Sequence, residues 1–424
     1  MISRIVRTSL DRIRQDRFLS NIVILLCGSL AVGAVNYLYQ FLMARMLTVA
    51  VYGELQTLLA IFTVTAIPTA TLATVLVKYT ADFKAKNQPN KIYSLFLILT
   101  KKTSVAAVAF FALFAIFSGQ IARFINLDSV WPLLILGIVF LFSFPSSINL
   151  GIIRGLQKFK ELSVISLISA LLKVAFSVLL VKLGFAINGA VGAITLAALV
   201  SYLLYFYPLK FLFKRQKEEV QVKEIGRYSF PVFFSLLFIA LLCNVDIILV
   251  KHFFSAQTAG EFGALAMLGN VIYFMAGPVA GVMFPMAADA HSSLKHPAKI
   301  LKKAICLTAL IGLGIVIFYF IIPDLIINIL IGGKFLAISK YLGWFGLSMF
   351  LYSLVALLAN YFLSVGKAMG AYLVGIGSLL QIVFIYIFHT SLWQIIWIMN
   401  GSMLLALFLL IFYFIRIYYL CPKN

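Results

Sequence analysis

Long runs of hydrophobic residues alternate with short polar segments along almost the whole chain. A helix of about 20 residues crosses the ~30 Å hydrocarbon core of a bilayer. The pattern predicts twelve such helices, near residues 20–46, 52–80, 95–118, 130–152, 162–182, 186–209, 228–252, 259–287, 300–321, 341–365, 368–388 and 391–418. Pro68 in the second helix, Pro231 in the seventh, and Pro278 or Pro285 in the eighth predict kinks or helix ends.

One sequence pattern occurs twice. Gly53-Glu54 returns 207 residues later as Gly260-Glu261, and the segment 89–92 returns as 297–300. A period of half the chain predicts two six-helix repeats, and an even number of spans in each makes the repeats parallel. Transporters built from such repeats place their substrate path between them. The pattern therefore predicts an all-α, two-lobed transporter.

Composition supports a polytopic membrane protein, because 63% of the 424 residues are hydrophobic and 11% are charged. The net charge of +21 would favour a nucleic-acid partner in a water-soluble chain, but here the basic residues follow the predicted topology. With the N-terminus inside, 27 lysines and arginines lie on the inner side and 6 on the outer side. This bias predicts a multi-pass protein of the cytoplasmic membrane with both termini in the cytoplasm and no nucleic-acid partner.

The predicted organisation has four parts. Residues 1–19 carry five arginines among spaced apolar residues, which is typical of a basic amphipathic helix on anionic membrane lipids. An N-terminal six-helix lobe covers 20–213, a charged cytoplasmic linker 214–227, and a C-terminal six-helix lobe 228–424. The four cysteines have neither metal-site spacing nor a disulfide pattern, so we expect no metal and no cofactor.

Lys173 stands near the middle of the fifth predicted helix, where an ionisable side chain is costly unless it is paired or hydrated. Ser163, Ser166, Ser169 and Ser177 share its face, within an arc of roughly 120° at ~100° per residue. We interpret this face as the lining of a water-filled cavity. The alternative is a serine-rich contact between helices, with Lys173 bonded to a neighbouring oxygen.

Asp246, in the seventh predicted helix, is the only carboxylate far from a span end. Lys251 lies about 140° away around the same helix, so a partner for Asp246 must come from another helix. Asp246 is a candidate for gating or for binding a proton or sodium ion. The alternative is a buried structural ion pair.

Other basic residues end predicted helices: Arg45 the first, Lys78 the second and Arg154 the fourth. Each is either an anchor at the membrane surface or a ligand contact. Arginine and lysine bind phosphate oxygens through charge-assisted hydrogen bonds, so a cationic lobe suits an anionic substrate. Asn36 and Gln40, one turn apart, add donors and acceptors for hydroxyl-rich cargo. The candidate substrate-binding residues are Lys173, Arg45, Lys78, Arg154, Asn36 and Gln40.

Short motifs occur in order along essentially the whole chain: residues 51–54 (VYGE), 154–159 (RGLQKF), 244–250 (NVDIILV) and 259–263 (AGEFG). The last two look like the seventh-helix signature of the polysaccharide flippases in the multidrug/oligosaccharidyl-lipid/polysaccharide (MOP) exporter superfamily. Residues 51–54 resemble the matching element of the first half in that family, and 154–159 resemble the end of its fourth helix.

This resemblance implies a V-shaped, MATE-like pair of six-helix bundles that works by alternating access and without covalent chemistry. The implied function is to move a polyprenyl-pyrophosphate-linked oligosaccharide through a cationic central cavity to the outer leaflet, for surface polysaccharide synthesis. Polysaccharide polymerase machinery is an implied partner. The residue after the seventh-helix aspartate is often basic in the family but is Ile247 here, so Asp246 alone is carried over.

Three alternatives stay open. A cation-coupled multidrug antiporter of the same superfamily should carry deep acidic residues, and the first six helices hold only Glu54, at a mouth. A lipid II flippase shares the cationic cavity but usually has additional C-terminal helices. A membrane enzyme needs catalytic acids, and the predicted outer loops hold only Asp128 and Asp324 as clear acids.

Overall fold

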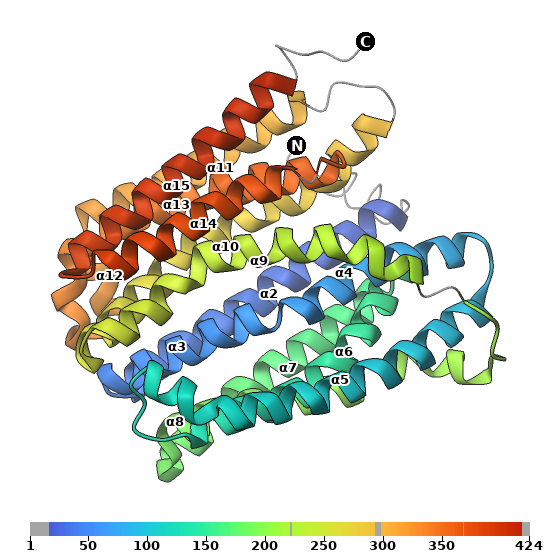
Figure 1. Ribbon diagram of the computed structural model, residues 1–424, viewed down its shortest axis with the longest axis horizontal. Coiled ribbons are helices and arrows are strands. Elements are labelled where there is room, and N and C mark those ends of the chain that lie inside the picture. Colours follow the sequence, from blue (N-terminus) through green and yellow to red (C-terminus); the bar gives the residue numbers. More distant parts are fainter. Residues whose placement is uncertain (1–16, 221–222, 293–297, 368, 418–424) are drawn as a thin grey trace, which may run out of the picture. The chain divides into compact units, whose positions relative to one another are not determined.

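The computed structural model describes residues 17–220, 223–292, 298–367 and 369–417 (Figure 1). Over these residues the chain is helical with short connections and contains no strand, so the predicted all-α fold class is confirmed. The predicted amphipathic helix over 1–19 falls almost entirely outside the described residues.

The helices follow one another in the order that the hydrophobic pattern predicts. They are α2 (Arg17–Met46), α3 (Val49–Thr65), α4 (Ile67–Ala85), α5 (Pro89–Phe124), α6 (Trp131–Gly155), α7 (Phe159–Leu180), η1 (Val181–Phe185), α8 (Ala186–Leu204), η2 (Tyr207–Lys214), α9 (Lys223–Phe253), α10 (Ala256–Ser292), α11 (Ala298–Ile321), α12 (Pro323–Leu330), η3 (Gly333–Ile338), α13 (Ser339–Ser364), α14 (Met369–Ile387) and α15 (Leu392–Ile415).

Membrane-spanning character is clear from length and composition. Within the described part of the chain, nine helices are long and apolar enough to cross a bilayer, and the bent pair α3–α4 brings the number to ten. One of the nine is a 46-residue stretch, 159–204, that merges α7 with α8. Gly184 interrupts it with a φ of 91°, a backbone conformation that favours glycine. The total of twelve spans stays a prediction.

The structure shows the predicted effect of a proline on helix geometry at Pro68. α3 and α4 are bent by 44° beside Pro68, which occupies the first turn of α4, where a missing N–H costs least. By contrast, Pro231 does not end α9, and neither Pro278 nor Pro285 ends α10. The predicted helix ends are therefore wrong at those three positions, and the alternative, a kink within α9 or α10, stays a prediction.

The chain forms two compact units that interleave along the sequence. Unit 1 comprises residues 1–40, 69–117 and 133–229, and unit 2 comprises 41–68, 118–132 and 230–424. Unit 2 thus includes α3, although α3 belongs to the first sequence repeat. The predicted lobe boundaries at 213 and 228 describe the linear repeat and stay a prediction.

Unit 1 is held together by tight helix contacts. Gly151 and Gly155, four residues apart on α6, face α4 so closely that an added Cβ at either position would lie 2.6 Å from a side-chain carbon of Leu76 or Thr80. Small residues at this spacing let membrane helices approach each other. α7 packs along α8, and the linker after η2 is tied to α5 by the Lys91–Glu218 ion pair at 3.6 Å.

Unit 2 is built around α10 and α13, which pack against each other. Both also contact α11, while α3 packs against α10 and α15 packs against α13. The rings of Phe262 and Phe345 meet edge to face at 5.5 Å, and the α10 residue Gly269 lies directly against Phe345. α13 is the most enclosed helix of the unit, because most of its side chains are buried.

Candidate functional site

Lys173 lies at the contact of α7 with α2 in unit 1. Its ammonium donates a hydrogen bond to Oδ1 of Asn36 and sits 4.5 Å from the centre of the Tyr39 ring. Tyr39 is fully buried and donates in turn to the carbonyl of Ala190 on α8, at 3.5 Å. Three helices therefore fix the position of this cation, and the structure brings the candidates Asn36 and Lys173 together.

The partners of Lys173 leave its charge uncompensated. An ammonium offers three donors, and both an amide oxygen and an aromatic face stabilise a cation without neutralising it. Among the described residues, no carboxylate forms an ion pair with Lys173. The half-buried side chain thus retains the capacity to bind an anion in a region of low dielectric.

Serines on the Lys173 face of α7 contact the neighbouring helices α2 and α8. Ser169 accepts a hydrogen bond from Ser201 of α8 at 2.6 Å, and Ser177 is fully buried. The Ser163 hydroxyl oxygen would lie 2.3 Å from a Cβ added at Gly28 of α2, so the two residues are closely packed. These serines occupy contacts between helices, because small polar side chains allow close approach there. Ser163 and Ser169 are half-buried, so the expectation that this face lines a water-filled cavity stays a prediction.

The other candidates in unit 1 lie on different segments. Gln40 is half-buried one turn after Asn36, and Lys78 is exposed on α4. Arg154 is exposed in the last turn of α6, between the two packed glycines of that helix. The contacts described for Lys173 involve none of the three, so their predicted role in substrate binding stays a prediction.

The segment 154–159, which resembles a family motif, forms the turn between α6 and α7. Gln157 adopts a left-handed conformation with a φ of 61°, which ends α6. Lys158 then donates to the carbonyl of Pro208 at 2.6 Å and lies 4.4 Å from the centre of the Phe211 ring. Partial burial lowers the pKa of the Lys158 ammonium, and the charge of Glu161 opposes this shift. Lys158 therefore ties the turn between α6 and α7 to η2, the segment that follows α8.

Asp246 is completely buried on α9 in unit 2. Neither carboxylate oxygen has a hydrogen-bond partner among the described residues. One turn earlier on α9, the Cys243 thiol lies 3.6 Å from Oδ1 of Asn270 on α10. A carboxyl group without hydrogen bonds is unfavourable as an anion, so this site is suited to take up a proton or a cation.

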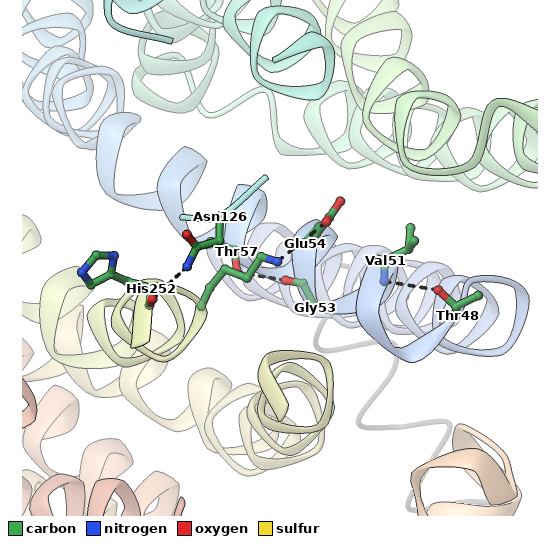
Figure 2. A network of polar contacts seen from close by, with 8 residues as sticks. Thr48, Val51, Gly53, Glu54, Thr57, Asn126 and His252 are labelled. Carbon is green, nitrogen blue, oxygen red and sulfur yellow. Dashed lines mark hydrogen bonds and ion pairs between the residues drawn. The ribbon is translucent and has the colours of Figure 1, made fainter. Parts of the chain in front are cut away.

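The structure assigns Lys251 a partner that sequence reasoning did not find. Its ammonium lies 3.7 Å from the carboxylate of Glu54 on α3, and the two side chains are 2% and 13% exposed. Next to it, Asn126 donates to the carbonyl of His252 at 2.9 Å, as Figure 2 shows. Three segments separated in the sequence are thereby joined. The internal repeat singled out Glu54, but only the tertiary structure reveals its partner.

α3 and α10 cross at the repeated Gly-Glu element. A Cβ added at Gly53 would lie 2.5 Å from the backbone nitrogen of Gly260, and one at Gly260 would lie 2.0 Å from the carbonyl oxygen of Val49. Backbone meets backbone here, so both positions require glycine. The repeated glycines therefore form a contact between equivalent helices of the two sequence halves.

Arg45 has a structural role at the C-terminus of α12. Its guanidinium donates to the carbonyl of Leu330 at 3.3 Å and also to that of Ile329. Lys334 reaches back to the carbonyls of Arg45, at 3.2 Å, and Leu47. Carbonyls at the end of a helix lack intrahelical partners, and basic side chains satisfy them. Substrate binding by Arg45 stays a prediction.

Unit 2 also contains a cavity of about 380 Å³ between α10, α11 and α13. Its polar lining residues are Tyr273, Thr308, Ser353 and Asn360, and none of its lining residues is charged. The buried hydroxyl of Thr308 has no hydrogen-bond partner among the described residues. The cavity combines neutral hydrogen-bonding groups with an aromatic ring.

Solved structures share this architecture at low sequence identity. An inward-facing multidrug resistance MATE family transporter of the MOP superfamily aligns with a TM-score of 0.71 and 17% identity, covering 94% of this chain and 98% of its own. The lipid II flippase MurJ aligns with a TM-score of 0.72 and 14% identity, covering 92% and 87%. A MOP superfamily transporter from Pyrococcus furiosus is described as having a binding pocket of reverse polarity. It aligns with a TM-score of 0.61 and 17% identity, covering 93% of this chain and 96% of its own. No curated protein matches the chain.

The fold is that of these polytopic membrane transporters of the MOP superfamily. A family profile described as "Polysaccharide biosynthesis protein" matches residues 18–291, and the chain belongs to that family. The predicted membership in the polysaccharide flippases and exporters of this superfamily is thereby confirmed.

Proposed function

We propose that this protein is a flippase that moves a polyprenyl-diphosphate-linked oligosaccharide from the inner to the outer leaflet of the cytoplasmic membrane. The observation that carries the proposal is Lys173, a cation deep in a membrane helix whose described partners are an amide oxygen and an aromatic ring. Such a cation is costly in a bilayer. A diphosphate headgroup supplies the negative charge that would compensate it.

Two further features support a glycolipid. The cavity lined by Tyr273, Thr308, Ser353 and Asn360 offers neutral donors and acceptors beside an aromatic surface, which suits the hydroxyl groups and apolar faces of sugar rings. Family membership relates the chain to polysaccharide synthesis. The headgroup would bind at Lys173 while the polyprenyl chain stays in the lipid, and alternating access would expose the headgroup outside.

The direction of movement agrees with the membrane potential. Outward transfer of an anionic headgroup from a negative interior gains about 2.3 kcal/mol per charge for each 100 mV. Asp246 would act as a gating group or take up the proton or sodium ion that drives the return of the empty protein.

A second candidate function is a cation-coupled multidrug antiporter. The buried carboxyl of Asp246 favours it, because cationic compounds and coupling ions need a negative group in the transport path. Lys173 opposes it, since a fixed positive charge repels such compounds. A lipid II flippase is a third possibility that differs from the first only in the sugar-linked headgroup.

Purified protein in proteoliposomes separates these functions. A polyprenyl-diphosphate oligosaccharide with a fluorescent sugar is placed in the bilayer, and its accessibility to an impermeant quencher is followed with and without a membrane potential. If the protein is a glycolipid flippase, we expect protein-dependent exposure of the headgroup that an interior-negative potential accelerates. Efflux of an organic cation without movement of the glycolipid would instead establish the antiporter, and faster movement of lipid II would establish the third function.

A further inference from the structure

A second cavity of unit 2 lies in a groove between the second half of α10 and the first half of α11. Its volume is about 470 Å³, and almost all of its wall is apolar. The groove is lined by Pro278, Val279, Val282, Met283, Met286, Lys299, Ile300, Lys303, Ala304 and Leu307. None of these residues lines the cavity of Tyr273 and Asn360, so the two cavities are separate.

The apolar wall has a closed floor and open sides. Met283 and Ala304 form the floor and are 2% and 6% exposed. Val282, Met286 and Leu307 flank it and are 37%, 52% and 47% exposed. A groove with these open sides is accessible from outside the helix pair, and in a bilayer a lipid chain can enter it. Methionine and branched side chains adapt well to a flexible hydrocarbon chain.

Two lysines stand at one end of the groove. Lys299 and Lys303 are exposed and lie in the first turns of α11, four residues apart, so they are separated by ~6 Å along the helix axis. Neither forms an ion pair within the described part of the chain. Lys302, between them in sequence, does not line the groove. The charge is therefore concentrated on the face of α11 that borders the apolar wall.

We propose that this groove binds an anionic phospholipid of the inner leaflet. The phosphate would lie between Lys299 and Lys303, and one acyl chain would follow the wall formed by Val282, Met283 and Leu307. Basic pockets between membrane helices on the cytoplasmic side recognise such headgroups. The predicted topology places the start of α11 on that side.

The size of the groove favours a phospholipid over a polyprenyl lipid. The lining residues of α10 run from Pro278 to Met286, which is ~12 Å of helix at 1.5 Å per residue. That length accommodates part of one acyl chain and only a small fraction of a long polyprenyl chain. The proposed site is independent of the transported substrate.

Site-specific fluorescence quenching tests the proposal. In protein whose four native tryptophans are replaced by phenylalanine, Leu307→Trp places a fluorophore on the groove and Leu310→Trp places one on the exposed surface of the same helix, 72% exposed. Each variant is reconstituted with brominated phosphatidylglycerol or brominated phosphatidylcholine at equal mole fraction. We expect the anionic lipid to quench more strongly at 307 and equally to the zwitterionic lipid at 310. Equal quenching by both lipids at 307 would overturn the proposal.

Charge variants and a competitor identify the occupant. Lys299→Gln and Lys303→Gln should each weaken the preference for the anionic lipid roughly fivefold, because each lysine contributes a similar attraction to an anionic headgroup. Lys302→Gln is the matched control and should leave it unchanged. A preference that survives the Lys299→Gln, Lys303→Gln double variant would contradict the assignment. Displacement of the brominated lipid by equimolar polyprenyl diphosphate would replace the phospholipid by the polyprenyl lipid as occupant.

Discussion

At the residue scale, the two deep lysines of the described chain have different partners. Lys251 is paired with the carboxylate of Glu54, so its charge is compensated within the protein. Lys173 is bonded to the neutral amide of Asn36 and keeps its charge. A compensated charge serves the stability of the fold, whereas an uncompensated one is available to a ligand.

Lys251→Ala should destabilise the protein by about 3 kcal/mol, because it leaves the carboxylate of Glu54 largely buried without a counter-charge. Thermal unfolding in detergent measures this as a lower melting temperature. The double variant Lys251→Ala, Glu54→Gln should recover much of the loss, since it removes the unpaired charge as well. Lys340→Ala, at an exposed position, is the control. An unchanged melting temperature for Lys251→Ala would show that the pair contributes nothing.

Asp246→Asn should keep or raise the melting temperature, because the amide matches the carboxyl group in shape and removes a buried charge that lacks hydrogen bonds. If Asp246 couples transport to a cation, the same variant should make the transport rate independent of the proton or sodium gradient. Reconstituted transport under imposed gradients measures this dependence. A strongly destabilised Asp246→Asn protein would indicate a structural ion pair instead.

The candidate residues could be predicted from sequence only in part. The position of Lys173 in an apolar run identified it as unusual, and its bond to Asn36 agrees with the expectation that both belong to one site. The partner of Lys251 could not be found, because Glu54 is 197 positions away and no local rule connects them. The surroundings of the serine face could not be assigned from sequence, because a polar face on a membrane helix can border either water or another helix.

At the element scale, the crossing of α3 and α10 depends on the absence of side chains. Gly53 and Gly260 occupy equivalent positions in the two repeats and touch each other through their backbones. Helices that approach this closely gain van der Waals contacts over their length. Glu54, which pairs with Lys251, directly follows Gly53 in the chain, so packing and charge stabilise the same region.

Gly260→Ala should destabilise this crossing by about 1 to 3 kcal/mol, because the new Cβ would meet backbone atoms of Val49 that have no rotamer by which to move away. Gly314→Ala on α11 is the matched control, since nothing lies within 4 Å of a Cβ added there. Melting temperatures of the two variants provide the comparison. Equal stability of both would show that α3 and α10 adjust to the methyl group at little cost.

A helix bend or end could be predicted from the sequence where a single residue determines it. Pro68 predicted the bend between α3 and α4, since proline cannot donate the backbone hydrogen bond of a helix interior. Pro278 gave the same signal, yet α10 continues through it, because neighbouring helices and local adjustment can stabilise a membrane helix around a proline. Gly184, whose backbone conformation interrupts the helical stretch between α7 and α8, was not distinguished from the many glycines inside helices.

At the scale of the whole molecule, the repeat predicted the class of fold but not its compact units. Residues 41–68 and 118–132 come from the first sequence half and join unit 2. A repeat reveals which segments are equivalent, whereas packing decides which segments contact each other. The unit boundaries within α2 and α5 were therefore beyond the reach of the sequence.

The predicted topology can be tested by labelling. In a variant without the four native cysteines, Lys182→Cys should react with an impermeant thiol reagent added outside intact cells, and Glu219→Cys should react only after the membrane is opened. Both side chains are exposed, so accessibility depends on the side of the membrane. The opposite pattern would invert the orientation drawn from the basic residues.

The most direct test of the central claim is the rate of glycolipid movement by Lys173 variants in proteoliposomes. Loss of a charge-assisted hydrogen bond to the diphosphate should slow Lys173→Ala roughly 10- to 100-fold at equal protein abundance. Lys173→Arg should retain part of the rate, and Lys182→Ala, at an exposed position, should retain all of it. Equal rates for the native protein, Lys173→Ala and Lys173→Arg would contradict the account, because the diphosphate would then bind elsewhere.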